Sequence, residues 1–213
     1  MLRLYGYFRS SAAYRIRIVL NMKGLAYAQS SIHLRRGEQF APAYRALNPL
    51  ARVPTLIDGE RVLTQSLAIA EYVEERWPEP PLLPREPDDR ARVRALALIV
   101  ACDIHPIQNT SVLAYIETAH GFDEPAKTRW AQHWIAGGFD AIETMLARDP
   151  ATGTYCHGER PTLADAFLIP QVANARRFDL DLTPYPTIVR IDAACRALAS
   201  FAAAAPERQP DAA

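Results

Sequence analysis

The run Arg9-Ser10-Ser11 joins a short apolar strand pattern to the start of a helical pattern. Doubly wound folds place ligands at junctions of this kind. The N–H groups and partial positive charge of a helix N-terminus favour an anion, and a serine hydroxyl there can donate to a thiolate or an oxyanion. The alternative is that Ser10 and Ser11 are ordinary helix caps, and the residues taken alone favour neither interpretation.

Two further positions could also either bind a ligand or be purely structural. Val53-Pro54 opens a strand pattern and is a candidate cis bond, which would leave the backbone of Val53 free to pair with an extended, peptide-like ligand; a trans proline at a sheet edge is the commoner outcome. In Gln65-Ser66 the serine is the expected N-cap of the next helix, so it is either a second anion site or a plain cap. The three positions together are more informative, because they converge at one edge of one small sheet.

The elements that would position these residues alternate between strand and helix over residues 1–80. The order predicts a mixed sheet with helices on its faces. The expected elements are a strand at Leu2–Tyr7, a helix between Ser10 or Ser11 and Gly24, a strand at Tyr27–Ile32, a hairpin of Val53–Ile57 and Arg61–Leu63 about Asp58-Gly59, and a helix at Ser66–Arg76.

A proline-rich stretch, residues 77–88, contains five prolines and is predicted to link two domains, 1–80 and 88–213. The second domain is expected to be all-helical. Its helical patterns cover Arg90–Asp103, Pro125–Ala147, Thr162–Ala175 and Thr187–Ala203. Thr162 and Asp165 have capping-box spacing, which we interpret as structural. The polar tail, Pro206–Ala213, is predicted to be loose.

Composition excludes several classes of function. Lys plus Arg number 24 and Asp plus Glu number 24, so no basic field favours nucleic acid or an anionic membrane. The sequence has no secretory signal pattern and no apolar run long enough to span a membrane.

Cys102, Cys156 and Cys195 form no CxxC pair, and reduced thiols suit the cytoplasm. His105 has no second ligand at metal spacing, so no metal is expected.

Longer segments resemble the zeta class of the glutathione transferases. The first, YFRSSAAYRIRIVLNMKGL, is similar to the class signature R-S-S-C-x-W-R-V-R-I-A-L. LNPLARVPTL, LTQSLAIAEYVEE, the PLLP linker, PTLADAFLIPQVANARRFDLDLTPYPTI and the closing RQPD are also similar, so the resemblance covers nearly the whole chain. It implies a thioredoxin-like N-terminal domain with a cis-proline that binds glutathione, an all-helical C-terminal domain that binds substrate, and a homodimer.

The resemblance also implies a role for individual residues. Ser10 would donate to the glutathione sulfur with Ser11 beside it, and Arg9 and Arg177 would face substrate carboxylates. The implied glutathione contacts are Gln39, Val53 with Pro54, Gln65 and Ser66, together with His105, Asn109, Thr110 and Ser111, where the helical domain would close over the ligands. Ala12 and Tyr14 replace the cysteine and tryptophan of the signature, which argues against an essential role for that cysteine.

The implied reaction is the cis–trans isomerisation of a maleyl dicarboxylic keto acid. A thiolate adds to the conjugated double bond, the resulting single bond rotates, and elimination returns the thiolate, so glutathione acts as a true cofactor. Maleylacetoacetate, from aromatic amino acid breakdown, is the expected substrate, since residues 106–111 (PIQNTS) lack the further arginine expected of maleylpyruvate enzymes.

Three alternatives stay open at this point. The first is maleylpyruvate isomerisation in gentisate breakdown. The second is a general glutathione transferase that conjugates electrophiles or removes halide from α-haloacids, and it would consume glutathione. The third, a non-catalytic interaction module, is disfavoured because Ser10, Pro54, Gln65 and Ser66 are all present.

Overall fold

The computed structural model describes residues 1–212, which form two compact units. The first unit contains Met1–Leu82 together with Arg196–Ala213, and the second contains Leu83–Cys195. The division at Leu82 lies inside the proline-rich stretch. The closing residues, from Arg196, belong to the first unit, whereas the sequence-based division assigned them to the second domain. They belong with the first unit because Arg17 and Asn21 donate to backbone carbonyls of Ala204 and Ser200, at 2.9 Å each.

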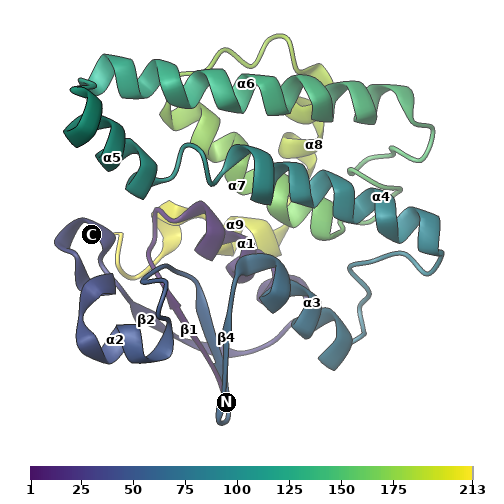
Figure 1. The fold of residues 1–213 in the computed structure, drawn as a ribbon. Helices are drawn as coiled ribbons and strands as arrows, with labels where there is room; N and C mark the ends of the chain where they lie inside the picture. Colours follow the sequence, from purple (N-terminus) through teal and green to yellow (C-terminus); the bar gives the residue numbers. More distant parts are fainter. Residues whose placement is uncertain (213) are drawn as a thin grey trace. The chain divides into compact units, whose positions relative to one another are not determined.

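The first unit contains a mixed four-stranded sheet in the order β2-β1-β3-β4 (Figure 1). β1 (Leu2–Gly6) pairs in parallel with β2 (Tyr27–Ser31) and antiparallel with β3 (Thr55–Asp58), which forms a hairpin with β4 (Arg61–Thr64). The hairpin turns at Gly59, whose φ of +60° suits a glycine. The mixed sheet and all four predicted strands are confirmed, with shifts of one or two residues at their ends.

Helices cover the sheet. α1 (Ser11–Met22) begins after the N-cap Ser10, as predicted. α3 (Ser66–Arg76) covers the predicted residues, but its N-cap is Gln65, whose side chain makes no cap bond, and the predicted cap Ser66 is the first residue of the helix. α2 (Pro42–Leu47), the 3₁₀ turn Glu38–Phe40 and α9 (Ala199–Ala204) complete the elements that bear on the site. The strands alternate between faces: Leu4 pairs with Leu56 in the buried core, whereas the ring of Tyr5 lies 5.9 Å from that of Tyr44 in α2.

The regular secondary structure of the second unit is entirely helical. Its helices are α4 (Pro87–Leu98), which continues as a π-helix over Ile99–Ile104, α5 (Thr110–His120), α6 (Glu124–Arg148), α7 (Leu163–Arg177) and α8 (Pro186–Arg196). The predicted patterns correspond to these helices with two differences. α5 was not predicted, and the pattern Thr187–Ala203 is two helices, because α8 ends at Arg196 and α9 begins only at Ala199.

α7 is the central helix of the second unit, and it is buried from Leu163 to Val172. The predicted capping box is present: the backbone N–H of Thr162 donates to Asp165 at 2.7 Å. The other carboxylate oxygen of Asp165 accepts the N–H of Cys156 at 2.8 Å. Burial raises the pKa of Asp165, and these backbone N–H donors oppose that rise. The carboxylate therefore fixes both the start of α7 and the loop before it.

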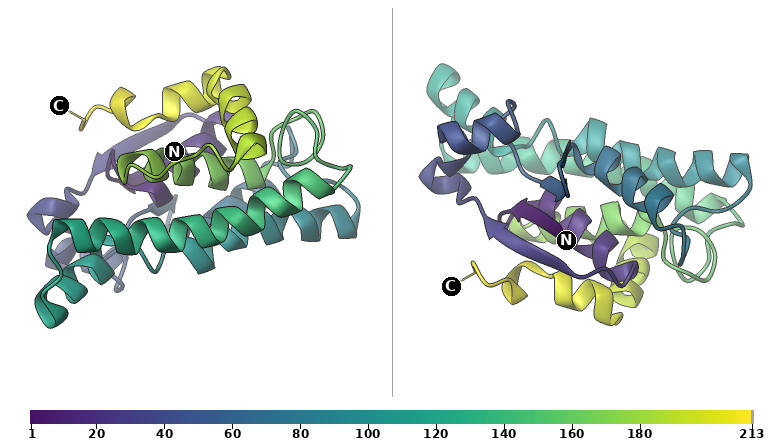
Figure 2. Two further views of the ribbon diagram at one scale, coloured as in Figure 1. Left: turned by 90° about the horizontal axis from the view of Figure 1, so that it is seen from above. Right: turned by 90° about the horizontal axis from the view of Figure 1, so that it is seen from below.

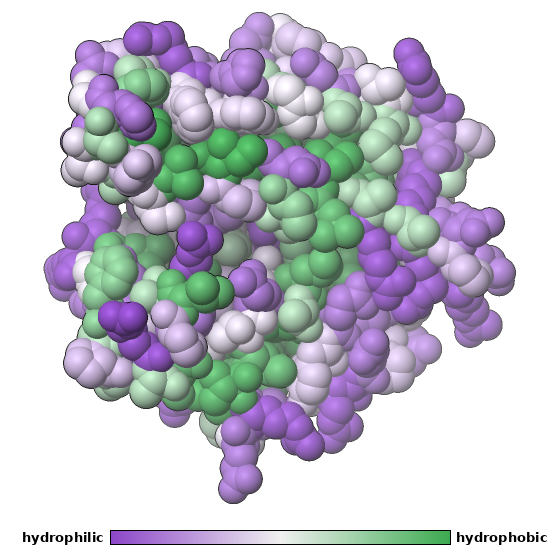
Figure 3. Space-filling view, viewed as in Figure 1, coloured by the Kyte–Doolittle hydropathy of each residue, from purple (hydrophilic) through white to green (hydrophobic). Residues whose placement is uncertain are grey.

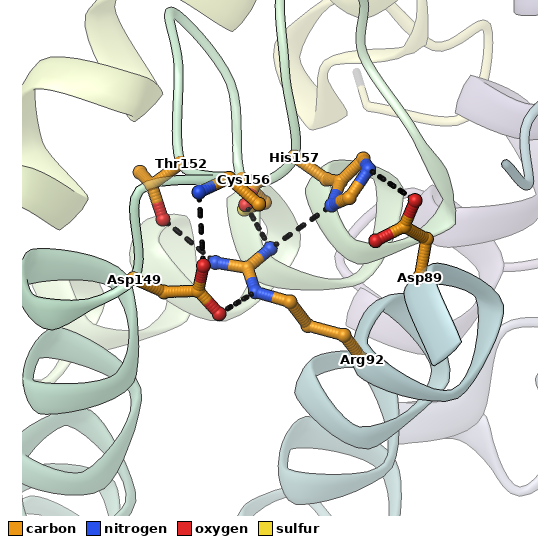
Figure 4. Close-up of polar contacts among 7 residues, drawn as sticks. Asp89, Arg92, Asp149, Thr152, Cys156 and His157 are labelled. Carbon is orange, nitrogen blue, oxygen red and sulfur yellow. Dashed lines mark hydrogen bonds and ion pairs between the residues drawn. The ribbon is translucent and has the colours of Figure 1, made fainter. Parts of the chain in front are cut away.

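A guanidinium holds the rest of that loop (Figure 4). Arg92 of α4 pairs with Asp149 at 2.6 Å and donates to the carbonyl of Cys156 and the hydroxyl of Thr152, both at 2.7 Å. The N–H of Ala151 and the Arg92 guanidinium hold the pKa of Asp149 below its usual value. Arg92 thus uses its fixed fork of donors to tie three points of one loop to one helix.

The surface of the first unit is mixed. Polar residues surround separate apolar patches in the lower half of Figure 3, and the large apolar side chains exposed on this unit include Phe40, Leu50 and Val62. Within residues 1–212 no helix combines the length and the apolar character needed to cross a membrane.

Replacing Arg92 with methionine should lower the free energy of unfolding by about 2 kcal/mol, because the bonds lost involve a charged donor. The contribution of Asp149 is complete above its unfolded-state pKa of about 3.9 and is lost as the pH falls through its lower folded-state value. The deficit measured by urea unfolding should therefore shrink in acid. Arg148→Met is the control, because Arg148 is exposed and directly precedes Asp149 in the chain. This change should lower the free energy of unfolding by less than about 1 kcal/mol. Equal losses in both variants would contradict this role for Arg92.

Candidate active site

The junction of β1 and α1 is a tight turn that ends in a helix cap. The N–H of Ser10 donates to the carbonyl of Tyr7 at 3.0 Å, and the Ser10 hydroxyl oxygen accepts the N–H of Ala13 at 3.2 Å. Because the oxygen accepts this bond, the hydroxyl proton is available to donate elsewhere. Ser11 follows as the first, buried residue of α1. Ser10 is thus both the predicted cap and a potential donor, so the two interpretations of the sequence are compatible.

The start of α3 is tied to α1 by a buried arginine. Arg15 donates from Nη1 to the hydroxyl of Ser66 at 3.1 Å. Arg15 is only 2% exposed and Ser66 is 8% exposed. This bond ties α1 to the start of α3 within the first unit, and the convergence of all three positions stays a prediction. Arg15 was not predicted to have a role. Its charged side chain lies inside an apolar helical run, and this pattern indicates a buried polar partner.

Gln65 has an unusual backbone at the same place. Its φ is +69° and its ψ is 118°, a region that L-residues rarely adopt. The Gln65 side chain is exposed, while Ser66 beside it is buried. Strained residues of this kind cluster at sites that bind ligands. Gln65 is therefore an exposed residue in an unusual backbone conformation at the N-cap of α3.

The Val53–Pro54 peptide bond is cis, as the sequence resemblance implied. Val53 is 8% exposed and lies just before β3. Within residues 1–212, no hydrogen bond uses its N–H or its carbonyl. The backbone of Val53 therefore has one donor and one acceptor available for an extended ligand.

Gln39 is a second residue with an unused polar atom. It lies in the 3₁₀ turn Glu38–Phe40, and its carbonyl Oε1 is buried with no hydrogen-bond partner among residues 1–212. A buried acceptor without a donor is costly in a folded protein. A ligand with an N–H group would satisfy it.

In the second unit, four of the predicted residues lie together at the start of α5. The π-helix after α4 ends at Ile104, and His105 is its C-cap. The Asn109 amide lies 3.4 Å from Nε2 of His105, and its oxygen caps α5 by accepting the N–H of Ser111 at 3.2 Å. Thr110 donates to the same oxygen at 3.1 Å. The family resemblance implied that these residues contact a ligand. The helix cap formed by Asn109 was not predicted.

The remaining predicted residues are arginines. Arg176 pairs with the buried Asp192 at 2.6 Å. Arg177, at the end of α7, donates to the side chain of Asn174, and its guanidinium lies 5.1 Å from the centre of the Phe178 ring. Arg177 is exposed, and Arg9 is half-buried in the turn before Ser10. Arg176 is exposed as well, and the roles of Arg177 and Arg9 at substrate carboxylates stay predictions.

The electrostatics of the first unit favour an anion at these helix starts. Neither α1 nor α3 has an acidic residue in its first turn. Hydroxyl donors and unopposed helix N-termini lower the pKa of a thiol held against them. No cluster of His, Cys, Asp or Glu within the described residues is arranged to hold a metal ion. The chemistry that this arrangement supports is stabilisation of a thiolate or an oxyanion.

Comparison with known proteins assigns this arrangement to a family. Residues 1–75 match the N-terminal domain model of glutathione S-transferases, and residues 124–206 match the C-terminal domain model. The chain is 51% identical to maleylpyruvate isomerase from Ralstonia sp, over 100% of both chains, and 51% identical to a probable maleylacetoacetate isomerase from Vibrio cholerae, over 98% of this chain and 97% of the relative.

Solved structures agree. A maleyl pyruvate isomerase described as a bacterial glutathione S-transferase of the zeta class superimposes with a TM-score of 0.98 at 52% identity, over 99% of this chain and 100% of that one. A maleylacetoacetate isomerase from Anaeromyxobacter dehalogenans, solved with dicarboxyethyl glutathione and citrate in its active site, gives 0.89 at 48% identity, over 100% and 98%.

The strain at Gln65 predicts an unusual substitution. Gln65→Gly should be more stable to unfolding than Gln65→Ala by about 1 kcal/mol, because glycine adopts this φ freely, which outweighs its larger loss of backbone entropy. Thermal unfolding of both variants measures the difference. An alanine variant as stable as the glycine variant would show that the Gln65 backbone is not strained.

Proposed function

The chain belongs to the glutathione S-transferase family, and from that premise we infer that it is a glutathione-dependent cis–trans isomerase of maleyl dicarboxylic keto acids. Its full-length relatives carry the names of such isomerases. The structural observation that carries the proposal is Ser10, a hydroxyl with an available proton at the start of a helix that has no acidic residue in its first turn.

The residues of the first unit fit glutathione, a short peptide with an anionic end. The unused N–H and carbonyl of Val53 suit the backbone of its cysteinyl residue. Gln65 and Ser66, at the start of α3, suit its γ-glutamyl end, and the unpartnered oxygen of Gln39 suits one of its N–H groups. Glutathione, when bound, supplies a thiolate that adds reversibly to the substrate double bond and so permits rotation.

Ser10 and α1 have the task of keeping that thiol ionised. A thiol with a pKa of about 8.5 is only a few per cent ionised at neutral pH, and lowering the pKa by about two units requires about 2.7 kcal/mol of selective stabilisation. A hydrogen bond to a charged group contributes about 1.5–3 kcal/mol and a helix N-terminus up to about 1 kcal/mol. Ser10 with α1 is therefore sufficient, and Ser11 is placed beside it.

Arginines serve the substrate in this proposal. Negative charge develops on a carbonyl oxygen next to the double bond, and the substrate also carries carboxylates. A planar guanidinium binds a carboxylate with two parallel bonds, which suits Arg177 and Arg9. The resemblance also implies polar contacts to glutathione from His105, Asn109, Thr110 and Ser111. The proposal thus assigns glutathione binding mainly to residues 1–80 and substrate binding mainly to residues 88–213, with Arg9 as an additional substrate contact.

The length of the substrate is the finer question. Residues 106–111 contain no arginine, which supports maleylacetoacetate, and the similar relatives are named for either substrate. We propose maleylacetoacetate as the principal substrate, with maleylpyruvate as the second candidate. We also propose, on the family resemblance, a cytoplasmic homodimer.

The test is to supply each maleyl compound with and without glutathione while measuring both fumaryl product and free thiol. Isomerisation that needs glutathione and conserves it supports the proposal, and the ratio of the rates identifies the substrate. Loss of thiol would instead indicate a conjugating transferase, and no turnover would indicate a binding module.

Ser10→Ala should reduce kcat/KM at neutral pH by about tenfold or more, because loss of one charged hydrogen bond raises the pKa of the bound thiol by about one to two units. The pH profile should move to higher pH by the same amount. Ser10 also caps α1, so Ser10→Thr, which keeps both the cap and the hydroxyl, is the control. An unshifted profile in the alanine variant would assign the donor to Ser11 or the backbone.

Arg177→Lys should raise KM for the substrate by about tenfold with little change in kcat, because an ammonium group cannot bind a carboxylate through two parallel bonds. Arg176→Lys is the matched control, since lysine preserves its ion pair with Asp192, and its KM should stay near that of the native protein. Similar KM values for both variants would show that Arg177 does not contact the substrate.

A further inference from the structure

Residues 206–212 of the C-terminal tail make specific hydrogen bonds, although the polar composition of Pro206–Ala213 predicted a loose segment; Ala213 lies outside the described residues. Gln209 is only 6% exposed. Its amide nitrogen donates to the carbonyls of Ala203 and Ala205 at 3.0 and 2.8 Å, and its amide oxygen accepts from Gln29 of β2 at 3.1 Å. The tail runs beside β2 in both views of Figure 2. Gln209 thus fixes the path of the chain at the RQPD motif, to which the proposed function gives no role.

Asp211, at the end of that motif, binds the loop that carries Ser10. Its Oδ2 atom accepts the backbone N–H of Phe8 at 3.0 Å and the hydroxyl of Ser31 at 2.9 Å. Phe8 lies in the turn between β1 and α1, two residues before Ser10. A bond to an ionised carboxylate is about twice as strong as one between neutral groups.

The backbone carbonyl of Phe8 is held as well, by a side chain from α1. Arg17 of α1 donates from Nη2 to the carbonyl of Phe8 at 3.1 Å and from Nε to the carbonyl of Ala204 at 2.9 Å. Burial lowers the pKa of Arg17 to about 10, so it stays charged at neutral pH. Arg17 therefore links the Ser10 loop, α1 and the end of α9.

We propose that Arg17 and Asp211 form a clamp on Phe8 that positions Ser10, so that the closing RQPD segment is part of the apparatus that ionises the bound thiol. The proposal rests on the proposed function of Ser10. Asp211 is a positioning residue in this proposal, because it would act on Ser10 through the backbone of Phe8. Loss of the clamp would allow Phe8 to shift, and Ser10, which is tied to Tyr7 by one turn bond, would shift with it. Displacements of about 1 Å at a reacting group cost up to about a hundredfold in rate.

The test compares three single variants. Asp211→Ala removes the acceptor, Asp211→Asn keeps an oxygen that can accept the Phe8 N–H, and Glu207→Ala removes an exposed charge elsewhere in the tail. In Asp211→Ala the segment around Phe8 should exchange its amide hydrogens faster, the pKa of bound glutathione should rise by about one unit, and kcat/KM at neutral pH should fall about tenfold. Asp211→Asn should restore most of each property, and Glu207→Ala should match the native protein.

Two outcomes would overturn the clamp. One is faster exchange around Phe8 in Asp211→Ala with an unchanged thiol pKa and rate profile, which would make the tail merely structural. The other is equal effects of Asp211→Ala and Glu207→Ala. If Asp211→Ala does not fold, a chain ending at Gln209 removes Asp211 but keeps the Gln209 anchor, and the same shifts are expected. Failure of the proposed function is distinguishable, because the native protein itself would then show no glutathione-dependent turnover.

Discussion

The burial of α1 is the constraint on which the first unit depends. Every residue from Ser11 to Leu20 is buried, including the arginines Arg15 and Arg17. Hydrogen bonds offset part of the cost of burying a guanidinium: Arg15 donates to Ser66, and Arg17 donates to the backbone carbonyls of Phe8 and Ala204. The helix therefore cannot slide or rotate without breaking buried polar bonds. Its N-terminus, with Ser10, is a fixed point from which an anion can be held.

The second unit repeats this principle with different residues. Asp165 and Arg92 hold the loop before α7, and α7 is buried through most of its length. Its far end carries Arg177. Four of the residues proposed to contact ligands lie at helix ends: Ser10 and Ser66 at N-termini, His105 and Arg177 at C-termini. Residues at helix ends are well placed for this, because the backbone groups beside them have no partner within the helix.

Local signals explain which parts of the fold could be predicted from sequence. The cap of α1, the Asp58-Gly59 turn and the capping box of α7 are formed by residues close together in the chain, and all were predictable. The N-cap of α3 was wrongly assigned to Ser66 and is Gln65. The cap of α5 was missed because Asn109 was interpreted only as a ligand contact. The ordered tail could not be predicted, since Asp211 and Phe8 are 203 positions apart and only the folded chain brings them together. The Arg15–Ser66 bond was missed for the same reason.

The central claim is that the fixed N-terminus of α1 holds a thiolate. The most direct measurement is a titration of glutathione bound to the native protein, following the ultraviolet absorbance of the thiolate as the pH is raised. The structure predicts an apparent pKa of about 6.5, about two units below that of a free thiol. A value near 8.5 for the bound thiol would contradict the account, because Ser10 and the start of α1 would then contribute nothing to its ionisation.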